Sequence, residues 1–325
     1  MEQIKKYQNS FLEYLAAHAF QKEPLGLYEP VNYILKLGGK RMRPIALLMA
    51  YQVFKEDFKA ALPAAYAIEI FHNFTLVHDD VIDDAPLRRG KPTVHEKWDL
   101  NTSILSGDVM LVYAYEYLLQ LENKAQIPAI IKTFNKTAIE VCEGQQYDVD
   151  FETQQDVSIG QYLRMIELKT SVLLAAAMKI GALAAGAKGT DAEHLYQFGR
   201  NIGIAFQLQD DYLDTFGDPK KFGKKVGGDI AKNKKTFLIL KALEIAPDGF
   251  KTELMTWMKD LSSEEHTKIS RVTAILKELN VPYLTKSLKN EFQATAFKHL
   301  EAVEAVKDRK QALIELAEML LDREV

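Results

Sequence analysis

The residues that interrupt regular structure gather in a few segments of this chain, and this distribution constrains its fold. The 325 residues include 17 glycines and 10 prolines, which cluster instead of recurring every ten residues as turns between short strands do. Between these clusters the apolar residues follow a helical period, and Ile68, Phe71, Thr75 and Ile82 approximate one stripe. We therefore predict an all-α protein of roughly ten or more helices, of average length or longer.

The breaks fall at residues 38–44, 86–92, 217–228 and 247–249. No segment has the composition of a flexible linker, and no repeat is visible apart from two aspartate motifs. A single domain over residues 1–325 is the simplest interpretation.

Composition excludes several classes of protein. The formal net charge of −4 gives no support to nucleic-acid binding, which requires an excess of Lys and Arg on one face. Cys142 is the only cysteine, so an internal disulfide and a cysteine-based zinc site are excluded. We expect a cytoplasmic protein, with Cys142 as a small buried hydrophobe.

Membrane and export signals are weak. The first 20 residues lack a long apolar region and a small-residue cleavage site, so we expect them to belong to the fold. The stretch Ser171–Ala187 is the most membrane-like, but it is short and carries Lys179 near its middle. We predict a buried core helix there and no membrane span; lining of a tunnel for an apolar substrate is the alternative.

Two acidic clusters carry the strongest chemical signal. Both have the form D-D-x-x-D, and their aspartates are Asp79, Asp80 and Asp83 in the first and Asp210, Asp211 and Asp214 in the second. Residues i and i+4 share a helix face, and like charges at this spacing repel unless cations neutralise them. Mg²⁺ prefers carboxylate oxygen and is commonly shared with substrate phosphates. The clusters therefore predict a metal-bound diphosphate.

Basic residues accompany each cluster. Arg88 and Arg89 follow the first; a lysine-rich loop follows the second, at 220, 221, 224, 225, 232, 234 and 235. A third set, Lys40, Arg41 and Arg43, lies between glycines and Pro44. Arginine matches phosphate oxygens with two parallel hydrogen bonds and lysine supplies a mobile charge. One D-D-x-x-D alone fits a solvated surface helix, but two copies with basic loops favour anion binding.

The two histidines near the first cluster are ambiguous. His72 precedes Asp79 by two helical turns, so we expect it to face the same cavity. For His78 we predict a packing role.

The motifs GGKRMRP, HDDVIDDAPLRRGKPT, GQQYD, LKT and FQLQDDYLD occur in this order. Together they closely resemble the trans-isoprenyl diphosphate synthases of the polyprenyl synthetase family, from about Gly38 to Phe237. The resemblance implies an all-α isoprenoid synthase fold with a large central cavity, and a homodimer. It also implies head-to-tail condensation of isopentenyl diphosphate with allylic diphosphates, with about three Mg²⁺ ions present when substrate is bound.

The resemblance also assigns roles to individual residues. The six aspartates would hold Mg²⁺ on the allylic diphosphate, and Asp84 is an additional carboxylate of open function. The allylic site would be lined by Arg88, Lys169, Thr170, Gln207, Lys224 and Lys234, with Gln145 and Asp148 near the cavity. The isopentenyl diphosphate pocket would contain Lys40, Arg43, His72 and Arg89.

Product length depends on bulk near the first cluster. In the family, a bulky residue five positions before the first motif often blocks the growing chain; here that residue is Phe74, with Phe71 one turn earlier. This resembles short-chain enzymes, so we expect an all-trans geranylgeranyl product, with farnesyl next. Plain core packing of Phe74 is the alternative, and Phe71 or Tyr51 would then form the floor.

Two other functions stay open. A class I terpene cyclase shares metal-driven ionisation, but would not need the pocket at Lys40, Arg43 and His72, and it usually carries a different second motif. A non-catalytic subunit of a heteromeric prenyl synthase tends to lose aspartates, and none is missing here.

Overall fold

The computed structural model describes residues 2–218, 226–259 and 264–321. Apart from one two-stranded hairpin, the regular structure in these ranges is helical, which confirms the predicted all-α class. The chain divides into two compact units. Unit 1 comprises Met1–Ala138, Leu173–Tyr196 and Ala302–Leu316; unit 2 comprises Ile139–Val172, Gln197–Glu301 and Ala317–Val325. The single domain expected from the sequence stays a prediction.

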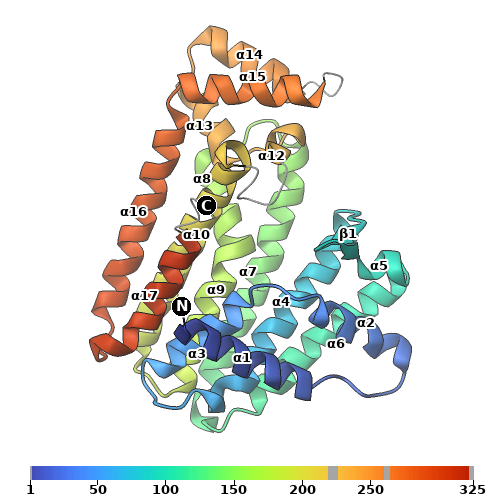
Figure 1. Ribbon diagram of the computed structural model, residues 1–325, viewed down its shortest axis with the longest axis vertical. Coiled ribbons are helices and arrows are strands. Elements are labelled where there is room, and N and C mark those ends of the chain that lie inside the picture. Colours follow the sequence, from blue (N-terminus) through green and yellow to red (C-terminus); the bar gives the residue numbers. More distant parts are fainter. Residues whose placement is uncertain (1, 219–225, 260–263, 322–325) are drawn as a thin grey trace. The chain divides into compact units, whose positions relative to one another are not determined.

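The elements are labelled in Figure 1. The first part of the chain contains α1 (Glu2–Ala17), α2 (Leu25–Lys36), α3 (Met42–Gln52), η1 (Lys59–Ala61), α4 (Leu62–Ile82), β1 (Leu87–Arg88), β2 (Lys91–Pro92), α5 (Val94–Lys97), α6 (Leu100–Leu119) and η2 (Lys124–Gln126). Then follow α7 (Ile127–Thr153), α8 (Ile159–Ile166), the π-helical turn η3 (Glu167–Ser171), α9 (Val172–Ala184) and α10 (Gly189–Phe216). The last are α12 (Gly228–Ala231), α13 (Phe237–Ile245), α14 (Asp248–Lys259), α15 (Glu265–Glu278), α16 (Val281–Ala302) and α17 (Lys307–Leu321).

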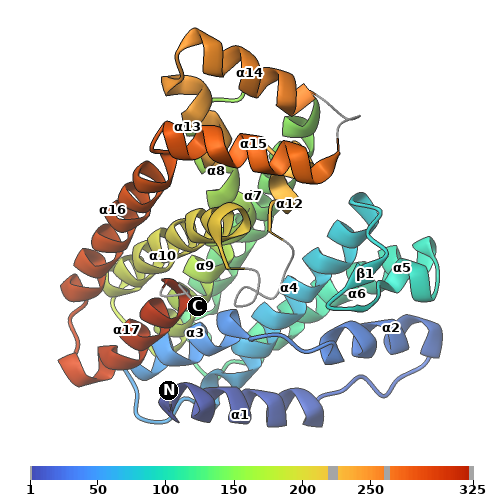
Figure 2. The same cartoon turned by 45° about the horizontal axis from the view of Figure 1, so that its top comes forward.

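Helix α4 forms the centre of unit 1. Pro63 lies in its first turn, where a missing N–H costs nothing, and no glycine or proline follows before the helix ends. The residues from Ala64 to Phe71 are all buried, and α4 packs against α3 and most extensively against α6, beside which it runs in both views (Figures 1 and 2). Ile82, expected on the same apolar stripe, is 54% exposed because it is the last residue of the helix.

One helix of the described part, Lys59–Ile82, is long and apolar enough to cross a membrane by length and composition. In its most apolar window 67% of the residues are buried inside the protein, as expected for a core helix. The segment that the sequence singled out is core as well: α9 is buried from Val172 to Ala184 except at Lys179, which pairs with Glu193.

Unit 2 contains two apolar clusters. The first joins the end of α7 to α8, α10 and α13, and includes Phe151, Tyr162, Leu208 and Phe237. The second joins α12 to the helices from α13 to α16, and α14 and α15 lie side by side in both views (Figures 1 and 2). Ser158 begins α8 with a reciprocal capping box to Gln161, which fixes the direction in which α8 enters the first cluster.

The loop predicted at residues 86–92 contains a short antiparallel hairpin. Leu87 pairs with Pro92 and Arg88 with Lys91, and Arg89 and Gly90 turn with φ of 54° and 73°. The hairpin follows α4 directly, and it holds two of the arginines that the sequence assigned to substrate.

Candidate active site

The first aspartate cluster lies at the carboxyl end of α4. The Asp83 amide donates to the Asp79 carbonyl at 2.8 Å, so helical hydrogen bonding continues one residue past Ile82. Asp79 and Asp83 therefore share a face, as the spacing predicts. The chain leaves the helix at Asp84, whose φ of 47° is left-handed.

Asp80 behaves differently from its neighbours. It is 1% exposed, and both of its oxygens accept from Arg88: Nε donates to Oδ1 at 2.9 Å and to Oδ2 at 2.8 Å, and Nη2 donates to Oδ1 at 2.7 Å. The same Nη2 lies 3.8 Å from Oδ2 of Asp79. Arg88, assigned to the allylic diphosphate, thus forms a bidentate ion pair with the first motif itself.

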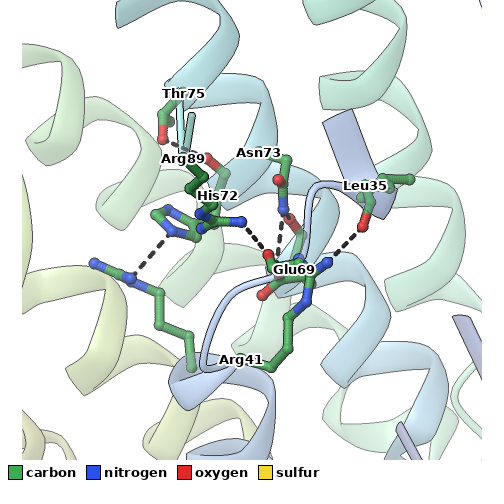
Figure 3. A network of polar contacts seen from close by, with 9 residues as sticks. Leu35, Arg41, Glu69, His72, Asn73, Thr75 and Arg89 are labelled. Atoms are coloured by element: carbon green, nitrogen blue, oxygen red, sulfur yellow. Dashed lines mark hydrogen bonds and ion pairs between the residues drawn. The ribbon is translucent and has the colours of Figure 1, made fainter. Parts of the chain in front are cut away.

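Arg41 of the third basic set and Arg89 of the hairpin lie close to His72 in unit 1 (Figure 3). Nη1 of Arg43 lies 3.2 Å from Nε2 of His72, and Arg89 donates to the Gly38 carbonyl. Gly39 has a φ of 118°, which side-chain-bearing residues rarely adopt, so glycine is needed at this turn beside the Arg89 guanidinium. The structure therefore brings together Arg43, His72 and Arg89, three of the four residues predicted for the isopentenyl diphosphate pocket; the fourth, Lys40, is exposed on the adjoining turn.

The electrostatics of this basic group suit the binding of an anion. Burial, and then the charges of Arg43, Arg89, Arg88 and Arg41, hold the pKa of His72 well below 6.5. The neutral ring accepts from Arg43 through Nε2, which leaves the proton on Nδ1. Within the described residues the Nε donor of Arg43 is buried without a hydrogen-bond partner. A diphosphate offers many acceptor oxygens for such donors.

Aromatic side chains line α4 one to two turns before the aspartates. The centroid of the Phe74 ring lies 5.6 Å from that of Phe71 and 4.8 Å from that of His78. The centroids of Phe71 and Phe134 are 5.0 Å apart. His78 reaches α6, where a Cβ on Gly107 would lie 2.2 Å from its Nε2. The predicted packing role of His78 is confirmed: its ring supports Phe74.

The second cluster occupies the last turns of α10. Asp211 is 4% exposed; it accepts from the Tyr162 hydroxyl and, at 3.0 Å, from Nε2 of Gln207. Burial raises the pKa of Asp211 from 3.8 to about 7, because desolvation disfavours the charged form. Gln207, assigned to the allylic site, thus contacts the second motif.

A further carboxylate, which the sequence reasoning missed, adjoins Asp214. The Asp229 amide donates to Oδ2 of Asp214 at 2.9 Å, and burial, with Asp214 beside it, raises the pKa of Asp229 to about 6. Lys234 lies 4.0 Å from Oδ1 of Asp229. The signal was available: Asp229 follows a glycine pair at the end of the lysine-rich loop.

The LKT segment lies in the π-helical turn η3, which packs against a glycine of α7 on one side and a glycine of α10 on the other. A Cβ on Gly144 of α7 would lie 2.2 Å from the Lys169 backbone nitrogen, and one on Gly203 of α10 would lie 2.7 Å from Cα of Ser171. Lys169 donates to Asp148 at 2.5 Å. Thr170 is half-buried beside it. Backbone-to-backbone packing therefore fixes the position of Lys169, and π-turns are frequent at functional sites.

The carboxylates suit a divalent ion that shares its ligands with substrate. Within the described ranges, no group of three or more His, Cys, Asp or Glu side chains is arranged to hold a metal by itself. Mg²⁺ is usually bound by one or two carboxylates together with phosphate oxygens and water. The half-buried Asp79 and Asp210, on the last turns of their helices, fit this pattern.

Two expectations need comment. Lys224 lies outside the described residues, as do Lys220, Lys221 and Lys225. The expectation for Cys142 was wrong: it is exposed, because it lies on the outer face of α7 beside the exposed Glu143.

Comparison with known proteins finds relatives along nearly the whole chain. A family model described as polyprenyl synthetase matches residues 25–278. A geranylgeranyl diphosphate synthase of Methanosarcina mazei is 36% identical over 309 residues, covering 93% of this chain and 91% of that protein.

Two solved structures are similar throughout. A geranylgeranyl pyrophosphate synthase has a TM-score of 0.93 and 45% identity, with 99% of each chain covered. A polyprenyl synthase from Caulobacter crescentus, complexed with calcium and isoprenyl diphosphate, has a TM-score of 0.85 and 26% identity; 100% of this chain and 98% of that one are covered.

Proposed function

The chain belongs to the polyprenyl synthetase family and is an isoprenyl diphosphate synthase, and from this premise we propose that it makes geranylgeranyl diphosphate. The reaction joins isopentenyl diphosphate to an allylic diphosphate head to tail, giving a short all-trans chain. The observation that supports the condensation itself, as distinct from the product length, is the basic group of Arg43, neutral His72 and Arg89 in the same unit as the first aspartate motif. Condensation of two diphosphates requires a second anion site of this kind.

The aspartates serve the allylic diphosphate. Asp79, Asp83, Asp210 and Asp214 would hold Mg²⁺, because Asp80 and Asp211, at 1% and 4% exposed, are the most buried members of the two motifs. Bound Mg²⁺ supplies Lewis-acid neutralisation of the leaving diphosphate. Lys169, Thr170, Gln207, Lys224 and Lys234 complete the allylic site in this proposal. Their cations and hydroxyl favour the charge that develops as the carbon–oxygen bond breaks.

The second substrate is held by Lys40, Arg43, His72 and Arg89. The proton on Nδ1 of His72 and the unmatched Nε of Arg43 are donors for its diphosphate. Holding this diphosphate fixes the double bond relative to the allylic carbon, an orientation effect worth several kcal/mol. The double bond attacks the allylic cation, and a proton then leaves the new chain for the released diphosphate.

Chain length is assigned to Phe74, supported by Phe71. The Phe74 ring is held between Phe71 and His78, so it cannot move aside freely as a chain grows toward it. A bulky, supported ring at this position favours a short product.

We also propose a homodimer formed through α6. Leu105, Val112 and Leu119 recur every seven residues on this helix and are 59%, 65% and 48% exposed. A heptad-spaced apolar stripe on the surface is typical of a helix that packs against another. Val112→Glu should shift the protein to the monomer mass in light scattering; a dimer of unchanged affinity would place the interface elsewhere.

A product assay tests the function. Purified protein is incubated with Mg²⁺, isopentenyl diphosphate and each allylic starter in turn, and the dephosphorylated products are chromatographed. A linear C20 alcohol is expected. A shorter or longer linear alcohol would overturn the chain-length proposal alone, whereas cyclic hydrocarbons, or no product, would point to the cyclase or the non-catalytic subunit.

A further inference from the structure

A buried carboxylate lies among the cations of the basic group. Glu69 of α4 is 2% exposed, and it precedes His72 by three residues and Asn73 by four, so the three side chains share one face of the helix. Figure 3 shows Glu69 between Arg41 and Asn73, with His72 one turn further along. No motif that identified the site contains this residue.

Glu69 ties together three segments of the chain. Nη1 of Arg41 donates to Oε1 of Glu69, and Nη2 of the same arginine donates to the Leu35 carbonyl at 2.5 Å. Nδ2 of Asn73 donates to Oε1 of Glu69 at 2.9 Å and to its carbonyl at 2.7 Å. The carboxylate thus links the end of α2, the start of α3 and the middle of α4.

The ion pair also fixes an unfavourable turn of the backbone. Arg41 precedes α3 with a φ of 52° and a ψ of 36°, a left-handed conformation that non-glycine residues seldom adopt. Lys40 and Arg43 lie one residue before and two residues after it. The position of Arg41 therefore determines the positions of Lys40 and Arg43, the two neighbouring cations assigned to isopentenyl diphosphate.

Glu69 also acts on the neighbouring charges. Burial lowers the pKa of Arg43 and of Arg89, and the Glu69 carboxylate opposes this lowering for both. Arg41, Arg43 and Arg89 would otherwise repel one another at close range. The carboxylate keeps these cations assembled before any diphosphate arrives.

We propose that Glu69 is a positioning residue for the isopentenyl diphosphate pocket, which it organises through Arg41 and through the charges of Arg43 and Arg89. This inference rests on the proposed function. Glu69 touches no substrate. It preorganises the pocket, so its loss should weaken the binding of isopentenyl diphosphate selectively. If the ion pair were purely structural, its loss would lower the stability of the protein and would weaken the binding of both substrates alike.

The test is a kinetic split on Glu69→Gln, which keeps the shape of the side chain and removes its charge. We expect the KM for isopentenyl diphosphate to rise at least about tenfold, while the KM for the allylic diphosphate and kcat change less than about threefold. Glu69→Asp, which keeps the charge but draws it back from Arg41, should fall between the parent and Glu69→Gln. Glu253→Gln is the matched control, because it removes a carboxylate that accepts two hydrogen bonds from Arg271 in unit 2; its kinetics should equal those of the parent.

A double variant guards against misfolding. Glu69→Gln leaves Arg41 buried without its counterion, which is more damaging than loss of both charges. If it fails to fold, R41Q/E69Q is assayed instead, and the same selective rise in KM is expected.

Three results would overturn the inference: an unchanged KM for isopentenyl diphosphate, an equal rise for both substrates, or a fall in kcat alone. If the parent itself forms no prenyl product, the proposed function fails; an active parent with non-selective variants sinks only the role of Glu69.

Discussion

Arg88 holds Asp80 from eight residues further along the chain, with three hydrogen bonds to its carboxylate, whereas the nearest approach of the same guanidinium to Asp79 is 3.8 Å. Adjacent aspartates of one motif therefore have different duties in the free enzyme. Asp80 fixes the hairpin to the end of α4, and the half-buried Asp79 is one of the metal ligands that we propose.

The different roles of Asp79 and Asp80 predict different effects of substitution. Asp79→Ala should lower kcat/KM about 100-fold or more while the free energy of unfolding changes by less than about 1 kcal/mol. Asp80→Ala should also lower the free energy of unfolding by about 2 kcal/mol, because Arg88 loses its partner in a partly buried site. Steady-state kinetics and urea titration measure both quantities. Asp210→Ala, run in parallel, should resemble Asp79→Ala, and parental turnover in either would remove that motif from the metal site.

The pKa of Asp211 predicts how stability depends on pH. Because this pKa is raised from 3.8 to about 7, the folded state keeps a proton that the unfolded state loses between these values. Stability should therefore fall as pH rises from about 4 to about 7, by on the order of 3 kcal/mol. Urea unfolding of metal-free protein across this range measures the slope. Asp211→Asn should flatten the slope, and an equal slope in this variant would assign the dependence to another group.

Removal of the Phe74 ring should lengthen the products. Phe74→Ala opens space beside Phe71 and His78, so the chain can add further five-carbon units before it meets a wall. Reversed-phase chromatography of the dephosphorylated products gives the distribution. Phe71→Ala is assayed in parallel, since a change confined to that variant would place the floor one turn earlier.

Two glycines should respond in opposite ways to alanine. Gly144→Ala places a Cβ 2.2 Å from the backbone nitrogen of Lys169, so α7 and η3 must separate, at a cost of about 3 kcal/mol, and Lys169 should lose its position and activity with it. Gly26→Ala, in α2, meets nothing within 4 Å and should stabilise the protein by about 0.5 kcal/mol. Thermal unfolding measures both; equal stability of the two variants would contradict the close packing at η3.

Local patterns were enough to predict the helices that carry chemistry. The absence of glycine and proline from α4 after its first turn and the i, i+4 aspartates of the two motifs correctly indicated helices with shared faces. The clustering of Arg43, His72 and Arg89 also followed from the motifs, although their contacts depend on the Gly38–Gly39 turn and the hairpin.

The remaining features are set by tertiary packing. Two-residue strands are too short to show alternation, so the hairpin at Arg88 could not be seen. Nothing in LKT marks a π-turn, because the turn is defined by contact with Gly144 and Gly203. The burial of Asp80 depends on Arg88, and that of Glu69 on Arg41. The expectation that Cys142 is buried was wrong for a related reason: cysteine is usually buried, but this one lies on an exposed face of its helix.

The turn at η3 makes the length of this segment as important as its composition. A π-turn holds one residue more than an α-helical turn, so deletion of a single residue between Glu167 and Ser171 would let the chain relax into a continuous α-helix from α8 into α9. Because the π-turn absorbs the additional residue, the helix beyond the deletion would keep its facing, whereas the side chains within the turn would change direction. The side chains of Lys169 and Thr170 would then point in other directions, although their chemistry is unchanged. Selection at this point therefore acts on the number of residues as well as on their identity.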